Sequence, residues 1–221
     1  MPIISPDEYY KSRYHTSPTR VGHTGGPCVG ARLRILSACV EPNDRVLDYG
    51  CGNGVIIGNI ARSIAIGPAS CGVDISAVAV EQARELFPNV KFYEMQRDAP
   101  LDDETYDVIL SAEVLEHVFD TGGIIAEWFR LLRPGGTLAI TVPYYGWIKD
   151  LLIVLSRRHE NHFHQVHDPH IRSFTKNTLR KVLTQGRFEV NEIVGFGSDS
   201  RPLTSLPFCW VSMFARSAKP G

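Results

Sequence analysis

Four features are absent from this 221-residue sequence, and each absence narrows its function. No charge of one sign dominates, because 23 Lys and Arg stand against 24 Asp and Glu, so no strong positive field would draw the chain onto nucleic acid. The five cysteines form no CxxC pair, which argues against zinc-finger or redox chemistry. No apolar run reaches membrane-spanning length, and the N-terminal stretch lacks the features of a secretion signal. We therefore expect a cytoplasmic protein without membrane insertion, and the sequence assigns no oligomeric state.

The sequence alternates between apolar, strand-like runs and amphipathic helical stretches. A composition of 43% hydrophobic and 21% charged residues suits one globular α/β domain. Repeated β–α units predict a parallel sheet covered by helices on both faces, and two late strands are expected to finish it with antiparallel pairing. The predicted strands are 45–49, 70–74, 90–93, 107–112, 136–142, 188–194 and 208–215, and the predicted helices are 29–40, 54–66, 76–87, 122–132, 148–155 and 175–185.

The alternation is interrupted once, where an aromatic start and an apolar helix lead into a stretch with five of the eight histidines. We interpret this stretch as an inserted cap over a substrate. The whole chain, 1–221, is then a single domain. Its expected parts are an N-terminal lid (1–28), a ligand-binding core (29–142), the cap (143–174) and a C-terminal helix with strands (175–221).

Residues Val46–Gly54 have the pattern of a strand that ends in a glycine-rich turn before a helix. Alternate glycines let a ligand approach the backbone beside a helix N-terminus. The nicotinamide fingerprint GxGxxG fails here, because Val55 and Ile57 stand where its third glycine would. Asp48, just ahead of the turn, disfavours a pyrophosphate but suits a ligand with positive charge. S-adenosylmethionine (SAM), which has an ammonium, a sulfonium and no phosphate, meets this requirement.

A second carboxylate, Asp74, ends the next predicted strand. There it can accept hydrogen bonds from both hydroxyls of a ribose, with Ile75 against the adenine. The alternative is that Asp74 caps the following helix, although Ser76 can do so equally well.

Five segments, in this order, resemble the successive motifs of class I SAM-dependent methyltransferases, among them ubiquinone-pathway O-methyltransferases. They are Val46–Gly54, Val73–Ile75, Tyr106–Ile109, Glu113–Val118 and Leu132–Leu138. The resemblance implies a doubly wound, Rossmann-like sheet of seven strands with the last strand antiparallel, here with the inserted helical cap. It also implies that SAM is the cofactor and that 29–142 is the SAM-binding core. The implied cofactor-binding residues are Asp48, Gly50, Cys51, Gly52, Asp74, Ile75, Gln96, Ala112 and Arg32.

Two of these cofactor assignments have alternatives. The position near the adenine falls at Met95 or Gln96, with Asp98 further along. The arginine for the methionine carboxylate is Arg32, with Arg34 as the alternative.

The segment after the fourth predicted strand carries groups that suit metal chemistry. Glu113, Glu116 and His117 stand at positions i, i+3 and i+4, so a helical turn would project them from one side. Two oxygens and one nitrogen form part of a divalent-metal site. The segment is similar to one in ubiquinone-pathway O-methyltransferases and in enzymes that methylate the 2′-hydroxyl at the 3′ end of small RNAs. That similarity implies Mg²⁺ or Zn²⁺ with a further histidine ligand, His170, or else His167.

The same segment can also be interpreted without a metal. Glu113 would then border the cofactor pocket, and Glu116 would form a cap or a pair. His117 would act as a general base or simply fill a polar interior position. The candidate catalytic residues are therefore His117 and His167, and the candidate metal ligands are Glu113, Glu116, His117 and His170.

The resemblance favours methyl transfer to a hydroxyl of a small molecule. Three aromatic residues at the start of the cap, Tyr144, Tyr145 and Trp147, favour a planar or carbohydrate-like acceptor, although they could also be cap core. One alternative is 2′-O-methylation of an RNA 3′ end, which would need a basic groove that this nearly neutral chain does not indicate. A second alternative is a SAM-binding protein without catalysis.

Overall fold

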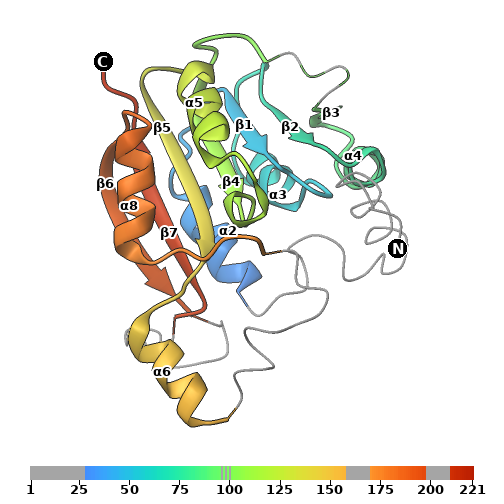
Figure 1. Cartoon of the computed structure of the whole chain (residues 1–221). Helices are drawn as coiled ribbons and strands as arrows, with labels where there is room; N and C mark the ends of the chain where they lie inside the picture. Colours follow the sequence, from blue (N-terminus) through green and yellow to red (C-terminus); the bar gives the residue numbers. More distant parts are fainter. Residues whose placement is uncertain (1–27, 96, 98, 100, 158–169, 198–209) are drawn as a thin grey trace.

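The computed structural model describes residues 28–95, 97, 99, 101–157, 170–197 and 210–221. Within them, a seven-stranded sheet has the order β3-β2-β1-β4-β5-β7-β6 (Figure 1). Strands β1 to β5 pair in parallel, and β7 pairs antiparallel with both β5 and β6. The predicted doubly wound sheet with an antiparallel last strand is thus confirmed. Its strands are β1 Val46–Tyr49, β2 Cys71–Asp74, β3 Lys91–Glu94, β4 Tyr106–Ala112, β5 Leu132–Pro143, β6 Glu189–Phe196 and β7 Ser212–Ala218.

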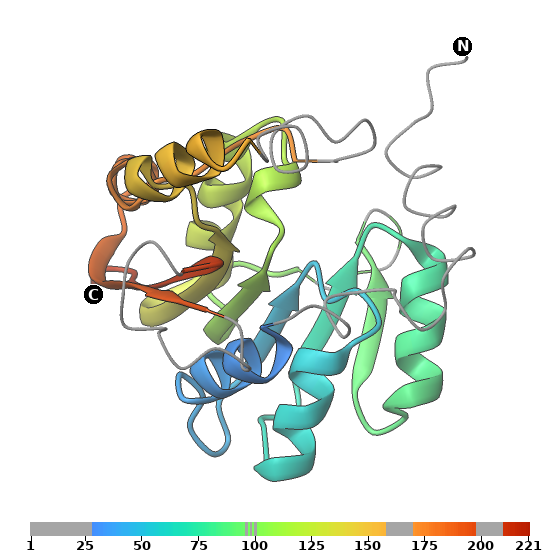
Figure 2. The ribbon, with the colours of Figure 1, turned by 90° about the horizontal axis from the view of Figure 1, so that it is seen from below.

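Helices cover both faces of this sheet, as Figure 2 shows. Helices α5 and α8 pack on one face, whereas α2, α3 and α4 pack on the other. None of the helices in the described ranges is long and apolar enough to cross a membrane. The helices are α2 Val29–Ser37, α3 Val55–Ser63, α4 Ala77–Leu86, α5 Thr121–Leu131, α6 Trp147–Leu155 and α8 Lys176–Gln185, with a short 3₁₀ turn, η1, at Leu115–His117.

Two apolar cores form because successive strand side chains point to opposite faces. On the α5 and α8 face, Leu47 of β1 is fully buried in one cluster with Trp128 and Leu183. On the other face, the preceding residue, Val46, is buried with Ile57 of α3. The near-continuous apolar character of these strands follows, since a sheet covered on both faces has no solvated side.

The strand order places a crevice between β1 and β4. The chain proceeds outward from β1 to β3 and then returns to β4 on the other side of β1. The loops that follow β1 and β4 therefore leave the sheet in opposite directions at its carboxyl edge, which is where open α/β sheets bind their ligands.

Several predicted boundaries differ from the structure. The second helix ends at Ser63 and not at residue 66, and the fifth strand begins at Leu132 and not at residue 136. The first helix ends at Ser37, not at residue 40. The last strand is Ser212–Ala218 and not 208–215, because its pairing with β5 continues to Ala218 through the polar residues Arg216 and Ser217. Hydrogen bonding to β5, not the apolar pattern, sets where this strand ends.

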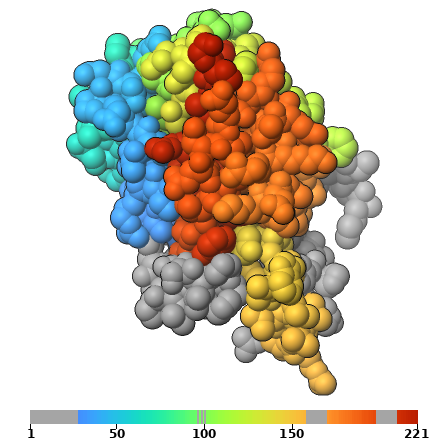
Figure 3. All heavy atoms as spheres, turned by 90° about the vertical axis from the view of Figure 1, so that its left-hand side faces the viewer, coloured from blue at the N-terminus to red at the C-terminus, as the bar shows by residue number. Residues whose placement is uncertain are grey.

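Helix α6 follows β5 and extends away from the sheet, as Figures 1 and 3 show. It buries no residue fully, and Trp147 at its start is 76% exposed. Its position after β5 agrees with the predicted inserted helix. The predicted lid, except Cys28, and most of the predicted histidine-rich stretch (158–169) lie outside the described residues.

Candidate cofactor and active site

The glycine turn follows β1 at the crevice. The backbone N–H groups of Gly50 and Cys51 both donate to the carbonyl oxygen of Val73 in β2, at 2.8 and 2.9 Å. Gly50, Gly52 and Gly54 have φ angles of 78°, 54° and 77°, a left-handed conformation that favours glycine. The turn is therefore fastened to β2 while its backbone faces the crevice.

Replacing Gly54 with Ala tests how tightly this turn is packed. A Cβ at Gly54 would lie 2.6 Å from Cζ of Phe92, and the residue would keep a φ of 77°. We expect a loss of about 1–3 kcal/mol in the free energy of unfolding, measured by urea denaturation. The matched control is Gly122→Ala in α5, where an added Cβ meets only Asp120 Oδ1, at 3.5 Å, so this variant should be neutral or slightly stabilising. Equal stability of the two variants would contradict the packing argument.

Asp48 lies at the carboxyl end of β1 and is 1% exposed. Its Oδ2 accepts a hydrogen bond from the backbone N–H of Ile57 at 3.3 Å, whereas its Oδ1 has no hydrogen-bond partner in the described part of the chain. Burial, with a smaller contribution from the charge of the nearby Asp74, raises the pKa of Asp48 to about 7. A cation beside Oδ1 would stabilise the ionised form of this carboxylate.

A small hollow opens beside Asp48. The hollow is lined by Asp48, Gly50, Cys51, Asn53, Val55, Ile56 and Ala112. Burial raises the pKa of the Cys51 thiol well above its usual range, so this residue lines the hollow as an apolar group and not as a nucleophile. A buried acceptor oxygen, a glycine turn and apolar walls together suit the charged methionine part of SAM.

Asp74 lies one strand away, at the end of β2, and is 8% exposed. Its Oδ2 accepts from the Gly52 N–H at 2.8 Å, and its Oδ1 accepts from the Ser76 N–H at 2.9 Å. Ser76, not Asp74, is the N-cap of α4, because its hydroxyl accepts from the N–H of Ala79. The helix-capping alternative for Asp74 is therefore wrong. The backbone N–H of Ile75 also acts on this carboxylate, which still has capacity to accept from a further donor.

Glu113 does not join the other predicted metal ligands. β4 ends at Ala112, the N–H of Glu113 still donates to Thr141 of β5 at 2.8 Å, and Glu113 then adopts a left-handed φ of 56°. Its Oε1 lies 3.3 Å from Nη2 of the buried Arg32. The predicted helical i, i+3, i+4 arrangement is wrong for Glu113, because η1 begins only at Leu115.

The other three predicted ligands, Glu116, His117 and His170, do come together, with one ligand atom of each lying within 4.8 Å of the others. Glu116 Oε1 is 3.7 Å from Nε2 of His117 and 3.9 Å from Nε2 of His170. The two imidazole rings are 4.8 Å apart between centroids, and the Glu116 side chain is fully buried. This group is called the Glu–His–His cluster below.

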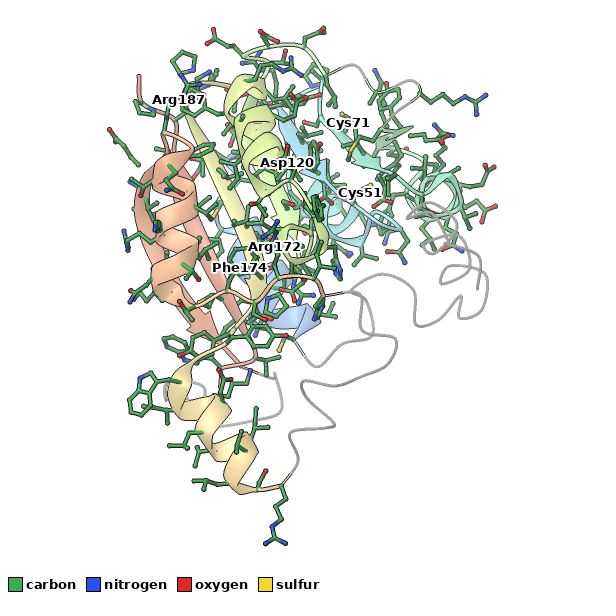
Figure 4. All side chains as sticks on the ribbon, viewed as in Figure 1. Cys51, Cys71, Asp120, Arg172, Phe174 and Arg187 are labelled. Carbon is green, nitrogen blue, oxygen red and sulfur yellow. The ribbon has the colours of Figure 1, made fainter. Side chains whose placement is uncertain are left out.

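The segment that carries His170 is fixed to η1 by backbone hydrogen bonds. The N–H groups of Ile171 and Arg172 both donate to the Glu116 carbonyl oxygen at 3.1 Å. The Arg172 guanidinium donates to the carbonyl oxygens of Val118 and Phe119. Figure 4 shows Arg172 and Phe174 on this segment, below the N-terminal end of α5 at Asp120. These bonds, and not sequence proximity, bring His170 to a glutamate 54 positions earlier in the chain.

The cluster adjoins the glycine turn. Val114 is the residue before η1, and a Cβ at Gly50 would overlap its side chain. The residues predicted to bind the cofactor and those predicted to act on the acceptor therefore share one edge of the sheet.

The predicted cofactor residues lie in several places. Asp48, Gly50, Cys51 and Ala112 line the hollow. Asp74 ends β2 and Ile75 follows it directly. Gly52 donates to Asp74 from the glycine turn, and Arg32 lies beside Glu113. Gln96 and His167 lie outside the described residues. Sequence reasoning missed Asn53, Val55 and Ile56, which also line the hollow. All three lie within or just after the predicted glycine turn, so the spacing of that turn could have indicated them.

Comparison with known proteins identifies the family. A family described as methyltransferase domain matches residues 40–188. A protein named as an S-adenosylmethionine-dependent methyltransferase of Mycolicibacterium smegmatis is 27% identical over 147 residues, which is 65% of this chain and 49% of the relative. The ubiquinone biosynthesis O-methyltransferase of Methylococcus capsulatus is 32% identical over 114 residues, which is 48% of this chain and 47% of the relative. The chain thus spans about half the length of these curated relatives.

A solved structure shares the fold over nearly the whole chain. It comes from the complex between the Haloferax volcanii Trm112 methyltransferase activator and a protein described as a methyltransferase. The TM-score is 0.72 at 18% identity, with 96% of this chain and 98% of that chain covered. At this identity the likeness shows the fold alone, whereas the family match covers more than half of the sequence. The chain belongs to the class I SAM-dependent methyltransferases.

Proposed function

We propose that this methyltransferase methylates a hydroxyl group of a small molecule, and that the Glu–His–His cluster activates the acceptor. The observation that carries the proposal is the position of the buried Glu116 beside two imidazoles, at the sheet edge that also holds the glycine turn. An oxygen nucleophile reacts readily only after losing its proton, so a basic group beside the methyl donor is what O-methylation needs.

The carboxylates at the ends of β1 and β2 are proposed to bind the methyl donor, SAM. In this proposal Asp48 faces the positively charged methionine part of SAM, and Asp74 accepts hydrogen bonds from the ribose hydroxyls, with Ile75 against the adenine. Arg32 would bind the methionine carboxylate through its Nε, which has no hydrogen-bond partner among the described residues. When bound, SAM supplies the methyl group, and the electron pair of the broken S–C bond stays on sulfur.

The Glu–His–His cluster is proposed to act on the methyl acceptor. Glu116 orients the His117 imidazole, and His117 accepts the proton of the acceptor hydroxyl. The acceptor oxygen then forms its new bond to the methyl carbon. His167, the other predicted catalytic residue, stays a prediction.

The same three side chains have the chemistry of a metal site. One carboxylate and two imidazoles form a set that catalytic zinc sites use, with a position left open for a water or substrate. A Zn²⁺ or Mg²⁺ ion there would lower the pKa of a bound hydroxyl. The ligand atoms around zinc are only about 3.4 Å apart, so the three groups, now within 4.8 Å, would have to draw closer.

The RNA alternative receives no support from Arg172, one of the few arginines near the cap. Its guanidinium already donates to the backbone carbonyl oxygens of Val118 and Phe119, so its hydrogen-bonding capacity is partly used within the site. Methylation of an RNA 3′ end would show steep salt dependence, because each neutralised phosphate releases counterions.

A turnover assay with catechol, thiol and amine acceptors tests the proposal. Methylated products are separated by mass spectrometry, and NMR shows whether the new methyl group is on oxygen. Activity that EDTA abolishes and Zn²⁺ or Mg²⁺ restores would support the metal, whereas activity unaffected by EDTA would assign the proton transfer to His117 alone. Transfer to carbon or nitrogen would overturn O-methylation. SAM binding without turnover of any catechol, thiol or amine would favour the non-catalytic alternative.

The affinity for SAM is expected to rise with pH up to about pH 7. Below that value Asp48 of the unliganded protein is protonated, because burial raises its pKa to about 7, and a cationic ligand must displace the proton. We expect at most a tenfold fall in Kd per pH unit between pH 5 and 7, measured by calorimetry. Asp48→Asn should flatten this dependence, and an unchanged slope in that variant would contradict the assignment.

Unliganded stability should change in the opposite direction. The folded-state pKa of Asp48, about 7, lies above its unfolded value of about 3.9, so the folded state holds the proton more tightly. The free energy of unfolding should therefore fall as pH rises from about 4 to 7, by at most about 1.4 kcal/mol per pH unit. The difference between the wild-type slope and that of Asp48→Asn isolates this residue.

A further inference from the structure

The chain between β5 and α6 builds a second polar group at the carboxyl edge of the sheet. The N–H of Tyr144 donates to Val211 at 2.9 Å, and the N–H of Tyr145 donates to Phe174 at 3.0 Å, which fixes both residues. A Cβ at Gly146 would overlap the phenol of Tyr144, so only glycine lets the Tyr144 ring lie against the start of α6. The Tyr144 ring also meets Trp210 edge to face, with centroids 5.2 Å apart.

Lys149, in the first turn of α6, folds its side chain back onto these aromatics. Its Nζ donates to the Tyr144 carbonyl oxygen at 2.8 Å and lies 5.7 Å from the Tyr144 ring centroid and 6.0 Å from that of Tyr145. Burial lowers the pKa of Lys149. Nowhere in the described ranges does a carboxylate form an ion pair with this ammonium. The charge of the adjacent Asp150 partly offsets the effect of burial on the pKa of Lys149 but forms no ion pair with it.

The contacts of Lys149 within the protein compensate its charge only partly. A partly buried ammonium is stable when an opposite charge or several acceptors replace the water that it loses. Lys149 has three N–H donors. Among the described residues its ammonium meets one carbonyl oxygen and two ring faces near the distance limit of a cation–π contact, which together are a weak substitute. An anion from a ligand would supply the missing charge.

We infer that Lys149 binds a carboxylate on the methyl acceptor, with Tyr144 and Trp210 against the planar ring that carries it. This inference rests on the proposed O-methylation and narrows its acceptor to an aromatic acid with a free hydroxyl. Aromatic side chains suit a planar ring, and an ammonium suits a carboxylate. Among the acceptors that the sequence leaves open, a neutral sugar would leave the Lys149 charge uncompensated.

The spacing of the two groups agrees with one small ligand. Phe174, which accepts from Tyr145, and His170, in the Glu–His–His cluster, belong to the same segment. Four residue steps span at most about 14 Å even when fully extended. This limit applies to the backbone between His170 and Phe174, and Lys149 lies beside the Phe174 end of that stretch through its bond to the Tyr144 carbonyl oxygen. The inference therefore requires an acceptor whose hydroxyl and carboxylate lie at opposite ends of one or two rings.

A pair of acceptors that differ in charge tests the inference. 3,4-Dihydroxycinnamate and its neutral amide have the same shape, and kcat/KM is measured for both with wild type, Lys149→Met, Lys149→Arg and the control Lys181→Met, an exposed lysine of α8. Wild type and Lys181→Met should prefer the acid by about tenfold or more, as expected for a charge-assisted hydrogen bond. Lys149→Met should lose this preference through a higher KM for the acid alone, and Lys149→Arg should largely restore it.

Other outcomes separate this inference from the proposed function. Equal kcat/KM for acid and amide in the wild type, with O-methylated products from both, would overturn the carboxylate site and leave O-methylation standing. If neither compound is methylated, binding is measured by calorimetry in the presence of S-adenosylhomocysteine. Binding of the acid that is lost in Lys149→Met would support the site even though the reaction fails, whereas no binding of the acid would overturn the site. Should Lys149→Met not fold, Lys149→Gln takes its place.

Discussion

Asp74→Ala is expected to weaken SAM binding by about 100-fold or more. A carboxylate that accepts from two ribose hydroxyls forms two charge-assisted hydrogen bonds, each contributing about 1.5–3 kcal/mol. Asp74 is 8% exposed, so water cannot easily replace those bonds. Asp74 also accepts from the Gly52 N–H, so its loss loosens the glycine turn as well. The measurement is the Kd for SAM by calorimetry.

Two further variants separate ribose binding from folding of the turn. Ser76→Ala removes the N-cap hydroxyl of α4 and should lower the free energy of unfolding by about 1 kcal/mol while leaving the SAM Kd unchanged. Asp74→Asn keeps one oxygen and should lose less affinity than Asp74→Ala. A folded Asp74→Ala protein that binds SAM with wild-type affinity would contradict the proposal that Asp74 binds the ribose.

His117→Ala is expected to lower kcat by about 10²–10⁴-fold while SAM binding stays intact. Removal of a positioned acid–base group typically lowers the rate by this factor. SAM binding should stay intact because Asp48 and Asp74, the residues proposed to bind SAM, lie on other elements. His117 Nε2 is 3.7 Å from the buried Glu116, which favours its protonated form after it accepts a proton. Glu116→Gln removes this charge and should lower kcat in the same direction. Single-turnover rates at saturating SAM measure the effect.

The paired histidine offers a control within the cluster. If His117 acts alone as a base, His170→Ala should reduce kcat less than His117→Ala does. If both bind a metal, the two variants should be equally impaired and should no longer respond to added Zn²⁺. A His117→Ala protein with wild-type kcat would remove the cluster from the reaction.

The donor half of the site could be predicted because its residues are neighbours in sequence. Asp48, the glycine turn and the start of α3 follow one another, and each residue type has a local reason to be there: glycine for left-handed φ, and a carboxylate at the end of a strand. Asp74 needed only the parallel pairing of β1 with β2. Local backbone geometry and strand order were sufficient for both.

The acceptor half depended on backbone detail that a residue pattern does not contain. Spacing alone placed Glu113 with Glu116 and His117, but the left-handed φ of Glu113 turns its side chain toward Arg32 instead. The choice of His170 came from a family resemblance, and the structure brings it to Glu116 through two backbone hydrogen bonds. Lys149 was not singled out, because an isolated lysine in a helix gives no sign that its side chain folds back.

The sequence by itself determined the glycine turn, the carboxylates at the carboxyl ends of β1 and β2, and the alternation of strands and helices along the chain. These features follow from short-range rules of dihedral preference and side-chain periodicity. The tertiary structure decided which of Glu113, Glu116, His117 and His170 meet, that Arg32 pairs with Glu113, and that Lys149 lies among aromatics. Those contacts join residues far apart in the chain, and their geometry is fixed only when the loops at the sheet edge pack against one another.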